Sequence, residues 1–208
     1  MKLQVAIDRV PLDVAKELAQ ILDSYADVIE IGTSLVKDYG NLAITTIKQA
    51  TKHAQLLVDS KTIDEGHYEF TQGFKHGADY ITVMGAASLD TLKTCYQVSE
   101  ALQKTMVIDL LEVQDEKIAQ ISGFDNALYA LHHSIDREDE FDAVATVTKF
   151  HQKFPTISRL AIAGGIDLLT AQDLAKQGII EQIIVGSAIT KAEDPIKAIK
   201  QFKEALLS

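Results

Sequence analysis

The chain has 208 residues, 47% of them hydrophobic, and a formal net charge of −10 at pH 7. It can bury a sizeable core, its acidic balance argues against nucleic acid or an anionic membrane surface as a partner, and no stretch reaches the ~18 apolar residues that a membrane span needs. With no signal peptide at its start and a single cysteine, Cys95, we expect a cytoplasmic protein without an intramolecular disulfide.

Eight short apolar runs follow one another along the chain and predict eight β-strands. They cover residues 3–7, 28–31, 55–58, 80–83, 105–108, 127–131, 159–162 and 182–185. A segment with helical periodicity follows each run, and helix starts are marked by Pro11, by Ser88 and by Asp194-Pro195. Strands without polar alternation, each followed by a helix, imply a parallel sheet covered by helices.

Eight such units predict an α/β protein in which residues 1–208 form one (β/α)8 TIM barrel. A doubly wound open sheet is the alternative, because periodicity alone does not show that a sheet closes. No linker, low-complexity tract or block of charge divides the chain. We therefore expect a single domain.

In such a barrel the chemistry collects at the carboxyl ends of the strands. The first polar residues after the successive runs are Asp8, Glu30, Asp59 with Lys61, Thr82, Asp109, His132, Gly164-Gly165 and Gly186-Ser187. The first three strands thus each bring a carboxylate to one rim. The strand period of two places Lys61 on the same side as Asp59. Grouped charges of this kind favour a charged ligand over a solvated turn.

The carboxylates of this rim predict a divalent cation. Lys61 neutralises one negative charge, and a hard ion would neutralise more. Mg²⁺ suits Glu30 and Asp59, because one or two carboxylates, waters and substrate oxygens complete its octahedron. Zinc is disfavoured, since no cysteine and only one histidine are expected on this face.

The last two strands are followed by glycine turns, at Gly164-Gly165 and at Gly186-Ser187. Backbone N–H groups approach an anion closely there, and these loops are the usual phosphate site of such barrels. Tight turns alone are the other reading. His132 and His133 end the sixth strand, and only one of them faces inward. That imidazole is either a general acid or base or a hydrogen-bonded rim residue.

Several of these motifs, taken in order over nearly the whole chain, resemble the orotidine-phosphate decarboxylase suprafamily. The resemblance rests on Val5-Ala6-Ile7-Asp8, Glu30-Ile31-Gly32-Thr33, the Asp-x-Lys-x-x-Asp at 59–64, residues 77–83, Ala163-Gly164-Gly165-Ile166 and residues 185–190. Within it, the chain resembles the branch of hexulose-phosphate synthases and ketogulonate-phosphate decarboxylases. Members of that branch are dimeric barrels that bind magnesium and stabilise a 1,2-enediolate.

Three positions bear on the reaction that the resemblance implies. Asp109 stands where the decarboxylases have a glutamate, Ile135 stands where they have an arginine, and no arginine follows Arg159. The resemblance therefore favours a reversible aldol condensation of D-ribulose 5-phosphate with formaldehyde. Decarboxylation of 3-keto-L-gulonate 6-phosphate is the alternative. The family's His-x-x-x-Asp spacing, which ends here at Asp136, favours His132 over His133 as the catalytic histidine. If His133 were that histidine, Arg137 would lie one residue beyond the position of the arginine in the decarboxylases.

The resemblance also implies a role for each site residue. Glu30 and Asp59 would hold Mg²⁺. Lys61, its charge kept by Asp8 and the neighbouring carboxylates, would donate to the enediolate oxygens. His132 would transfer protons, and Asp109 would bind a substrate hydroxyl or orient that base. Asp64 would reach into the partner subunit's site, and Asp8 would bind the substrate. The phosphate would be bound by Gly164, Gly165, Gly186 and Ser187.

Overall fold

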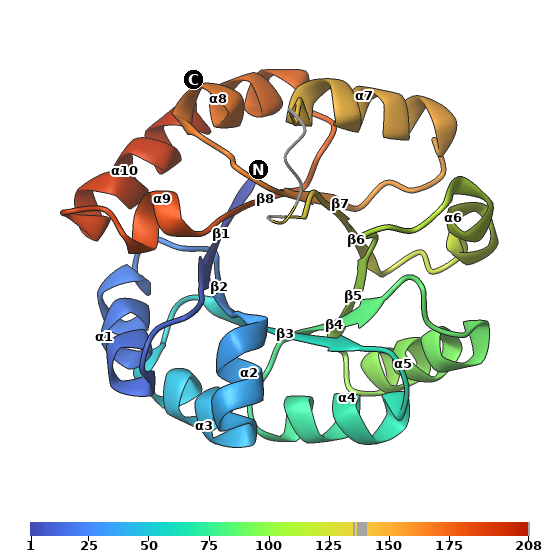
Figure 1. The fold of residues 1–208 in the computed structure, drawn as a ribbon, viewed down its shortest axis with the longest axis horizontal. Helices are drawn as coiled ribbons and strands as arrows, with labels where there is room; N and C mark the ends of the chain where they lie inside the picture. The colour runs from blue at the N-terminus through green and yellow to red at the C-terminus, as the bar shows by residue number, and fades with distance from the viewer. Residues whose placement is uncertain (135, 137–140, 208) are drawn as a thin grey trace.

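The computed structural model describes residues 1–134, 136 and 141–207. Its eight strands, all parallel, pair in chain order and close into a barrel (Figure 1). They are β1 (Lys2–Ile7), β2 (Val28–Ile31), β3 (Gln55–Thr62), β4 (Tyr80–Met84), β5 (Thr105–Asp109), β6 (Leu128–His132), β7 (Leu160–Ala163) and β8 (Gln182–Val185). The fold is therefore the predicted (β/α)8 TIM barrel, and the open doubly wound sheet is excluded.

The helices form an outer ring around the strands (Figure 1). They are α1 (Leu12–Leu22), α2 (Thr33–Tyr39), α3 (Asn41–Ala50), α4 (Gly66–Lys75), α5 (Leu89–Ala101), α6 (Asp115–Ile121), α7 (Ala143–Lys153), α8 (Leu168–Gln177), α9 (Ser187–Thr190) and α10 (Pro195–Ala205). The sequence predicts one helix after each strand, but two helices follow β2 and two follow β8. After β2, Gly40 with φ 54° separates α2 from α3, and after β8 the short α9 precedes α10.

The predicted helix starts are confirmed. The side chain of Ser88 accepts a hydrogen bond from the N–H of Thr91 and so caps α5, and α1 begins directly after Pro11. Asp194 caps α10 in the same way, with Pro195 at the first helical position. A cap of this kind satisfies one of the N–H groups that a helix start leaves unpaired.

The core has two layers. Apolar side chains of the helices pack on the outer face of the sheet, and Val28, Leu57, Tyr80, Val107, Leu128, Ala130 and Ala161 form a separate buried cluster. These seven residues come from six successive strands, β2 to β7, so their side chains fill the barrel and leave no pore. The chemistry must therefore lie at the rim.

Strand β3 runs four residues beyond the predicted end at Val58. Its register with β4 shifts between Val58 and Thr62. The hydroxyl of Ser60 donates to the Thr82 carbonyl (3.0 Å), which ties the polar end of β3 to β4. Sequence periodicity does not find this extension, because its residues are charged or polar and are held by hydrogen bonds.

Asp79 stabilises the opposite end of the barrel, directly before β4. Its carboxylate accepts the N–H of Leu56 (3.0 Å) and pairs with Lys48 Nζ (3.1 Å) and Lys104 Nζ (2.6 Å). Burial alone would raise the pKa of Asp79, but the hydrogen bonds from Lys104 and Leu56 outweigh burial and lower the pKa below its ordinary value of 3.8. A carboxyl whose pKa is lowered by folding stabilises the fold above that ordinary value, and the contribution is lost as the pH falls through the folded pKa.

We expect Asp79→Asn to lower the free energy of unfolding by about 1–3 kcal/mol at pH 7, because a charged hydrogen-bond acceptor is lost. The deficit should shrink below about pH 4, where the Asp79 carboxyl of the unfolded wild-type chain begins to protonate while the folded one is still ionised. Urea unfolding at pH 7 and at pH 3 measures both values. Asp90→Asn is the control, since Asp90 pairs with Lys93 at 3.9 Å and is 96% exposed. An equal deficit at both pH values would contradict the argument.

Candidate active site

Four side chains, two from β3 and one each from β5 and β6, meet at the carboxyl end of the barrel. Lys61 Nζ lies 2.6 Å from Asp109 Oδ2 and 3.3 Å from Asp59 Oδ2. His132 Nδ1 lies 3.1 Å from the same Oδ2 atom of Asp109. One carboxylate oxygen therefore contacts both the ammonium and the imidazole.

Lys61 reaches this cluster through an unusual backbone. Its φ is 49°, a left-handed conformation that is strained for a residue with a side chain. The hydroxyl of Thr82 accepts the N–H of Lys61 (2.9 Å) and donates to Asp59 Oδ1 (2.8 Å). The expectation that simple strand alternation aligns Lys61 with Asp59 is thus corrected: both point into the cluster, but a bulged strand held by Thr82 brings them there.

The electrostatics keep this cluster charged. Burial alone would lower the pKa of Lys61, yet the negative charges of Asp59 and Asp109 raise it above its ordinary value. Burial alone would raise the pKa of Asp109, but the hydrogen bond from His132 and the charge of Lys61 lower it to about 2. At neutral pH Lys61 is an ammonium and Asp109 a carboxylate. A bound substrate would therefore meet a fixed hydrogen-bond donor.

Glu30 on β2 is 8% exposed and faces the same end of the barrel. Burial, together with the negative charge of Asp59, raises the pKa of Glu30 to about 8. Without a cation the ionised form of Glu30 is therefore disfavoured, a bound divalent cation would favour that form, and carboxylate oxygens are the ligands that Mg²⁺ prefers. Glu30 and Asp59 therefore fit the predicted ion. Within residues 1–134, 136 and 141–207, no group of three or more acidic, histidine or cysteine side chains could hold a metal. Water and substrate oxygens would complete the shell.

Asp8 lies at the end of β1 with a different partner from the one we expected. Its Oδ1 accepts hydrogen bonds from the hydroxyl of Ser34 and from the Ser34 N–H (3.2 Å). The described ion pairs of Lys61 are with Asp59 and Asp109. Asp8 therefore makes no described ion pair with Lys61, because α2 supplies donors that satisfy it, and its expected effect on the charge of Lys61 stays a prediction. A Cβ on Gly32 would lie 2.7 Å from Asp8 Cγ, so this position needs glycine.

The two glycine turns lie next to each other, because β7 pairs with β8. Gly164 and Gly165 have φ values of 123° and 59°. Gly165 is exposed, and a Cβ added there would meet no atom within 4 Å beyond its chain neighbours. Gly186 directly precedes α9, which begins at Ser187. Because the first N–H groups of a helix have no partner within that helix, the turn before α9 offers backbone donors of the kind that a phosphate site requires.

The remaining predictions concern Asp64, the choice between the two histidines, and two residues after them. Asp64 is exposed in the loop after β3, accepts the N–H of Glu65 (2.8 Å) and does not join the cluster of its own chain. His133 stacks on Phe141, with ring centroids 4.5 Å apart, so His132 is the histidine that contacts Asp109. Ile135 and Arg137, on which part of the distinction between the two reactions rests, lie outside the described residues.

Sequence reasoning missed some polar residues around the cluster. Thr33 Oγ1 donates to Asp59 Oδ2 (2.6 Å), and Gln4 Nε2 donates to Glu30 Oε2. Gln4 interrupts the apolar run of residues 3–7. A glutamine in the middle of a barrel strand was the available signal, because a buried amide needs a buried partner.

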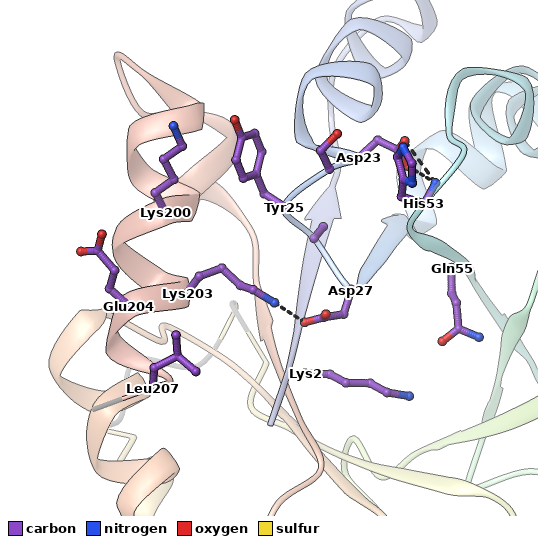
Figure 2. A pocket seen from close by; sticks show the side chains of 12 residues that line it. Lys2, Asp23, Tyr25, Asp27, His53, Gln55, Lys200, Lys203, Glu204 and Leu207 are labelled. Atoms are coloured by element: carbon purple, nitrogen blue, oxygen red, sulfur yellow. Dashed lines mark hydrogen bonds and ion pairs between the residues drawn. The ribbon is translucent and has the colours of Figure 1, made fainter.

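A pocket of about 620 Å³ lies at the other end of the barrel beside α10 (Figure 2). Its carboxylates already have partners: Asp27 pairs with Lys203 at 2.8 Å, and Asp23 accepts the N–H groups of Lys52, His53 and Ala54. None of the predicted site residues that the structure describes lines this pocket. Pocket size therefore does not mark the candidate active site.

The fold and the site together define a class. A closed (β/α)8 barrel with a lysine between carboxylates at its rim, and with glycine turns after its last two strands, is an enzyme barrel whose chemistry lies at the carboxyl ends of its strands. Residues 1–202 match the model of the Orotidine 5'-phosphate decarboxylase / HUMPS family, and the chain belongs to that family.

Three named proteins show which members of this family the chain resembles. The chain is 34% identical over 212 residues to the 3-hexulose-6-phosphate synthase of Staphylococcus haemolyticus strain JCSC1435, covering 99% of both chains. The crystal structure of the 3-hexulose-6-phosphate synthase from Salmonella typhimurium superposes with a TM-score of 0.91 at 32% identity, over 100% of this chain and 99% of that one. The structure of the 3-keto-L-gulonate-6-phosphate decarboxylase of Vibrio cholerae O1 biovar El Tor superposes with a TM-score of 0.86 at 27% identity, over 99% of this chain and 96% of that one.

Among the described residues, no helix is long and apolar enough to cross a membrane.

Proposed function

We propose that this protein is a 3-hexulose-6-phosphate synthase, which joins formaldehyde to C1 of D-ribulose 5-phosphate in a reversible Mg²⁺-dependent aldol reaction. The observation that carries the proposal is the shared contact of Lys61 and His132 with one oxygen of Asp109, beside Glu30 and Asp59. That arrangement supplies both a proton-transfer group and a positive charge. An enediolate, formed when a proton leaves the carbon next to a ketone, needs both.

Each side chain has one task in this mechanism. His132 takes the C1 proton of the sugar and returns a proton to the formaldehyde oxygen as the new carbon–carbon bond forms. Lys61 donates a hydrogen bond to the developing oxyanion, and Asp109 holds Lys61 and His132 in place. Glu30 and Asp59 would hold Mg²⁺, which supplies Lewis-acid stabilisation of the enediolate when it is bound. Asp8 would bind a substrate hydroxyl.

Backbone groups would bind the phosphate, since the net charge of −10 leaves only local means of holding an anion. Gly164, Gly165, Gly186 and Ser187 present N–H groups at neighbouring strand ends. The left-handed φ of Gly165 favours a residue without a side chain, and the open space beside it leaves room for the ligand. The sugar would then extend from this anchor toward Lys61.

We also propose a homodimer with shared active sites, in which Asp64 serves the partner subunit. In support, Asp64 is exposed, and two large apolar side chains of the same segment are exposed with it: Ile63 is 55% and Tyr68 62% exposed. Large exposed apolar side chains of this kind are available to an interaction surface. The cytoplasm is the proposed location, because the one cysteine, Cys95, is buried and unpaired.

Mixing two inactive variants tests the shared site. Lys61→Ala and Asp64→Asn should each be nearly inactive alone. After subunit exchange, half of the dimers are mixed and each has one intact site, so about a quarter of wild-type activity should return. The activity of a refolded one-to-one mixture measures this. A mixture as inactive as its components would contradict a shared site.

Decarboxylation of 3-keto-L-gulonate 6-phosphate is the second candidate, favoured by the structural likeness to the Vibrio cholerae decarboxylase. A paired assay with Mg²⁺ separates the two reactions: one arm follows formaldehyde loss with ribulose 5-phosphate, and the other follows CO₂ release. We expect formaldehyde consumption to dominate and a chelator to abolish it. Predominant CO₂ release would reject the synthase.

A further inference from the structure

Two buried glutamines connect β8 and β1 with the candidate cation ligand on β2. Gln182 and Gln4 are 0% and 1% exposed. Gln182 Nε2 donates to Gln4 Oε1, and Gln4 Nε2 donates to Glu30 Oε2. Strand β1 pairs with both β8 and β2, so the three side chains form a continuous row inside the barrel.

This row has a direction. A glutamine amide can present either its NH₂ group or its oxygen to a neighbour, and toward an ionised Glu30, the form that binds a cation, only the NH₂ group can donate. The NH₂ group of Gln182 occupies the oxygen of Gln4. With its oxygen held in that way, Gln4 must turn its own NH₂ group toward Glu30.

The arrangement is costly for the fold. Gln182 Oε1 is buried and has no hydrogen-bond partner among the described residues. An unpaired buried oxygen destabilises a protein, and an apolar side chain at this position would avoid the cost. A polar residue that costs stability is expected where it serves the site.

We infer that Gln182 and Gln4 form an amide relay that fixes one oxygen of Glu30 and leaves its other oxygen, Oε1, for a divalent cation. Gln182 is then a positioning residue that acts through Gln4. The described hydrogen bond of Glu30 is through Oε2, and Oε1 is not among the buried atoms that lack a partner. The role of the cation in this inference rests on the proposed function, whereas the orientation of Gln4 does not.

Two measurements on the full chain without substrate test the relay. Mn²⁺ titration by calorimetry gives the cation affinity. The ¹⁵N-edited spectrum gives the side-chain NH₂ resonance of Gln4, which is assigned by its disappearance in Gln4→Leu. We expect Gln182→Leu to shift that resonance and to raise the Kd for Mn²⁺ about tenfold, the usual effect of removing a group that orients a metal ligand. Gln4→Leu should raise it at least as much.

The double variant Gln4→Leu/Gln182→Leu should bind Mn²⁺ no worse than Gln4→Leu, because Gln182 acts through Gln4. Gln177→Leu is the matched control. Gln177 also has a buried Oε1 without a described partner, but it ends α8 and its NH₂ group donates to Val144 O and Thr148 Oγ1 of α7, in the outer ring of helices. This variant should leave both readouts unchanged. If Gln182→Leu does not fold, Gln182→Met takes its place.

The outcomes separate the relay from the proposed function. An unchanged Gln4 resonance in Gln182→Leu, or additive losses of affinity in the double variant, would overturn the relay. If the wild-type protein binds no Mn²⁺, the proposed metal site fails, and the Gln4 resonance alone then decides for or against the relay.

Discussion

Replacing Lys61 with alanine is expected to lower kcat by about 10²- to 10³-fold, the usual effect of removing one preorganised donor to a developing oxyanion. Lys61 Nζ contacts both Asp59 and Asp109, so its loss also leaves two carboxylates close together without a cation. Binding of the phosphosugar should change far less, because the phosphate is expected at the glycine turns. A protein that only binds a phosphosugar would show no such separation of turnover from affinity.

Steady-state kinetics and direct ligand titration measure the two quantities. Lys104→Ala is a matched control: Lys104 Nζ lies 2.6 Å from Asp79 Oδ1, the distance found between Lys61 and Asp109, but at the opposite end of the barrel. That variant should lose stability and keep its turnover. Retention of more than about a tenth of wild-type kcat by Lys61→Ala would contradict the role given to Lys61.

The second large effect is expected from Asp109→Asn, which should lower kcat by about 10²- to 10⁴-fold, the range associated with general acid–base groups. The substitution removes the charge that both Lys61 and His132 contact. Exchange of the C1 proton of ribulose 5-phosphate with D₂O, followed without formaldehyde, should slow in parallel. Normal exchange with slow aldol formation would instead place Asp109 only in the second half-reaction.

Asp109→Asn should also change how stability depends on pH. Folding lowers the pKa of Asp109 from 3.8 to about 2, so the wild-type carboxylate stabilises the fold above the ordinary value and loses that contribution as the pH falls toward 2. The variant should therefore be less stable than wild type at pH 7, and the two should converge in acid. Urea unfolding at several pH values between 2 and 7 measures this. A constant difference would mean that the charge is not responsible.

Local sequence patterns, the apolar runs and the helix caps, predicted most of the fold. Apolar runs located every strand, and the caps Ser88 and Asp194 located two helix starts, because burial and capping depend on neighbouring residues. The extension of β3 was missed for the opposite reason: Ser60 and Lys61 are held in the sheet by Thr82, which is remote in sequence. The division at Gly40 depends on a left-handed backbone that apolar periodicity does not report.

The site was predictable where position along a strand decides the outcome. Asp59, Lys61, Asp109 and His132 follow their apolar runs and meet at the rim as expected. The partner of Asp8 was not predictable, because α2 places Ser34 beside it only once the chain has folded. The direction of the buried glutamine row depends on strand pairing around the closed barrel, which no local pattern contains. The roles of the site residues, the cation and the dimer stay predictions.

The single oxygen that Lys61 and His132 share has a consequence for how this barrel could change its reaction. Both groups take their position from the length of one side chain, Asp109 at the end of β5. A glutamate there would move the shared oxygen by about one carbon–carbon bond, or ~1.5 Å, and would displace the ammonium and the imidazole together. A change from the proposed aldol reaction to decarboxylation would therefore require coordinated substitutions on β3, β5 and β6. A single substitution at position 109 would give a poorly active protein.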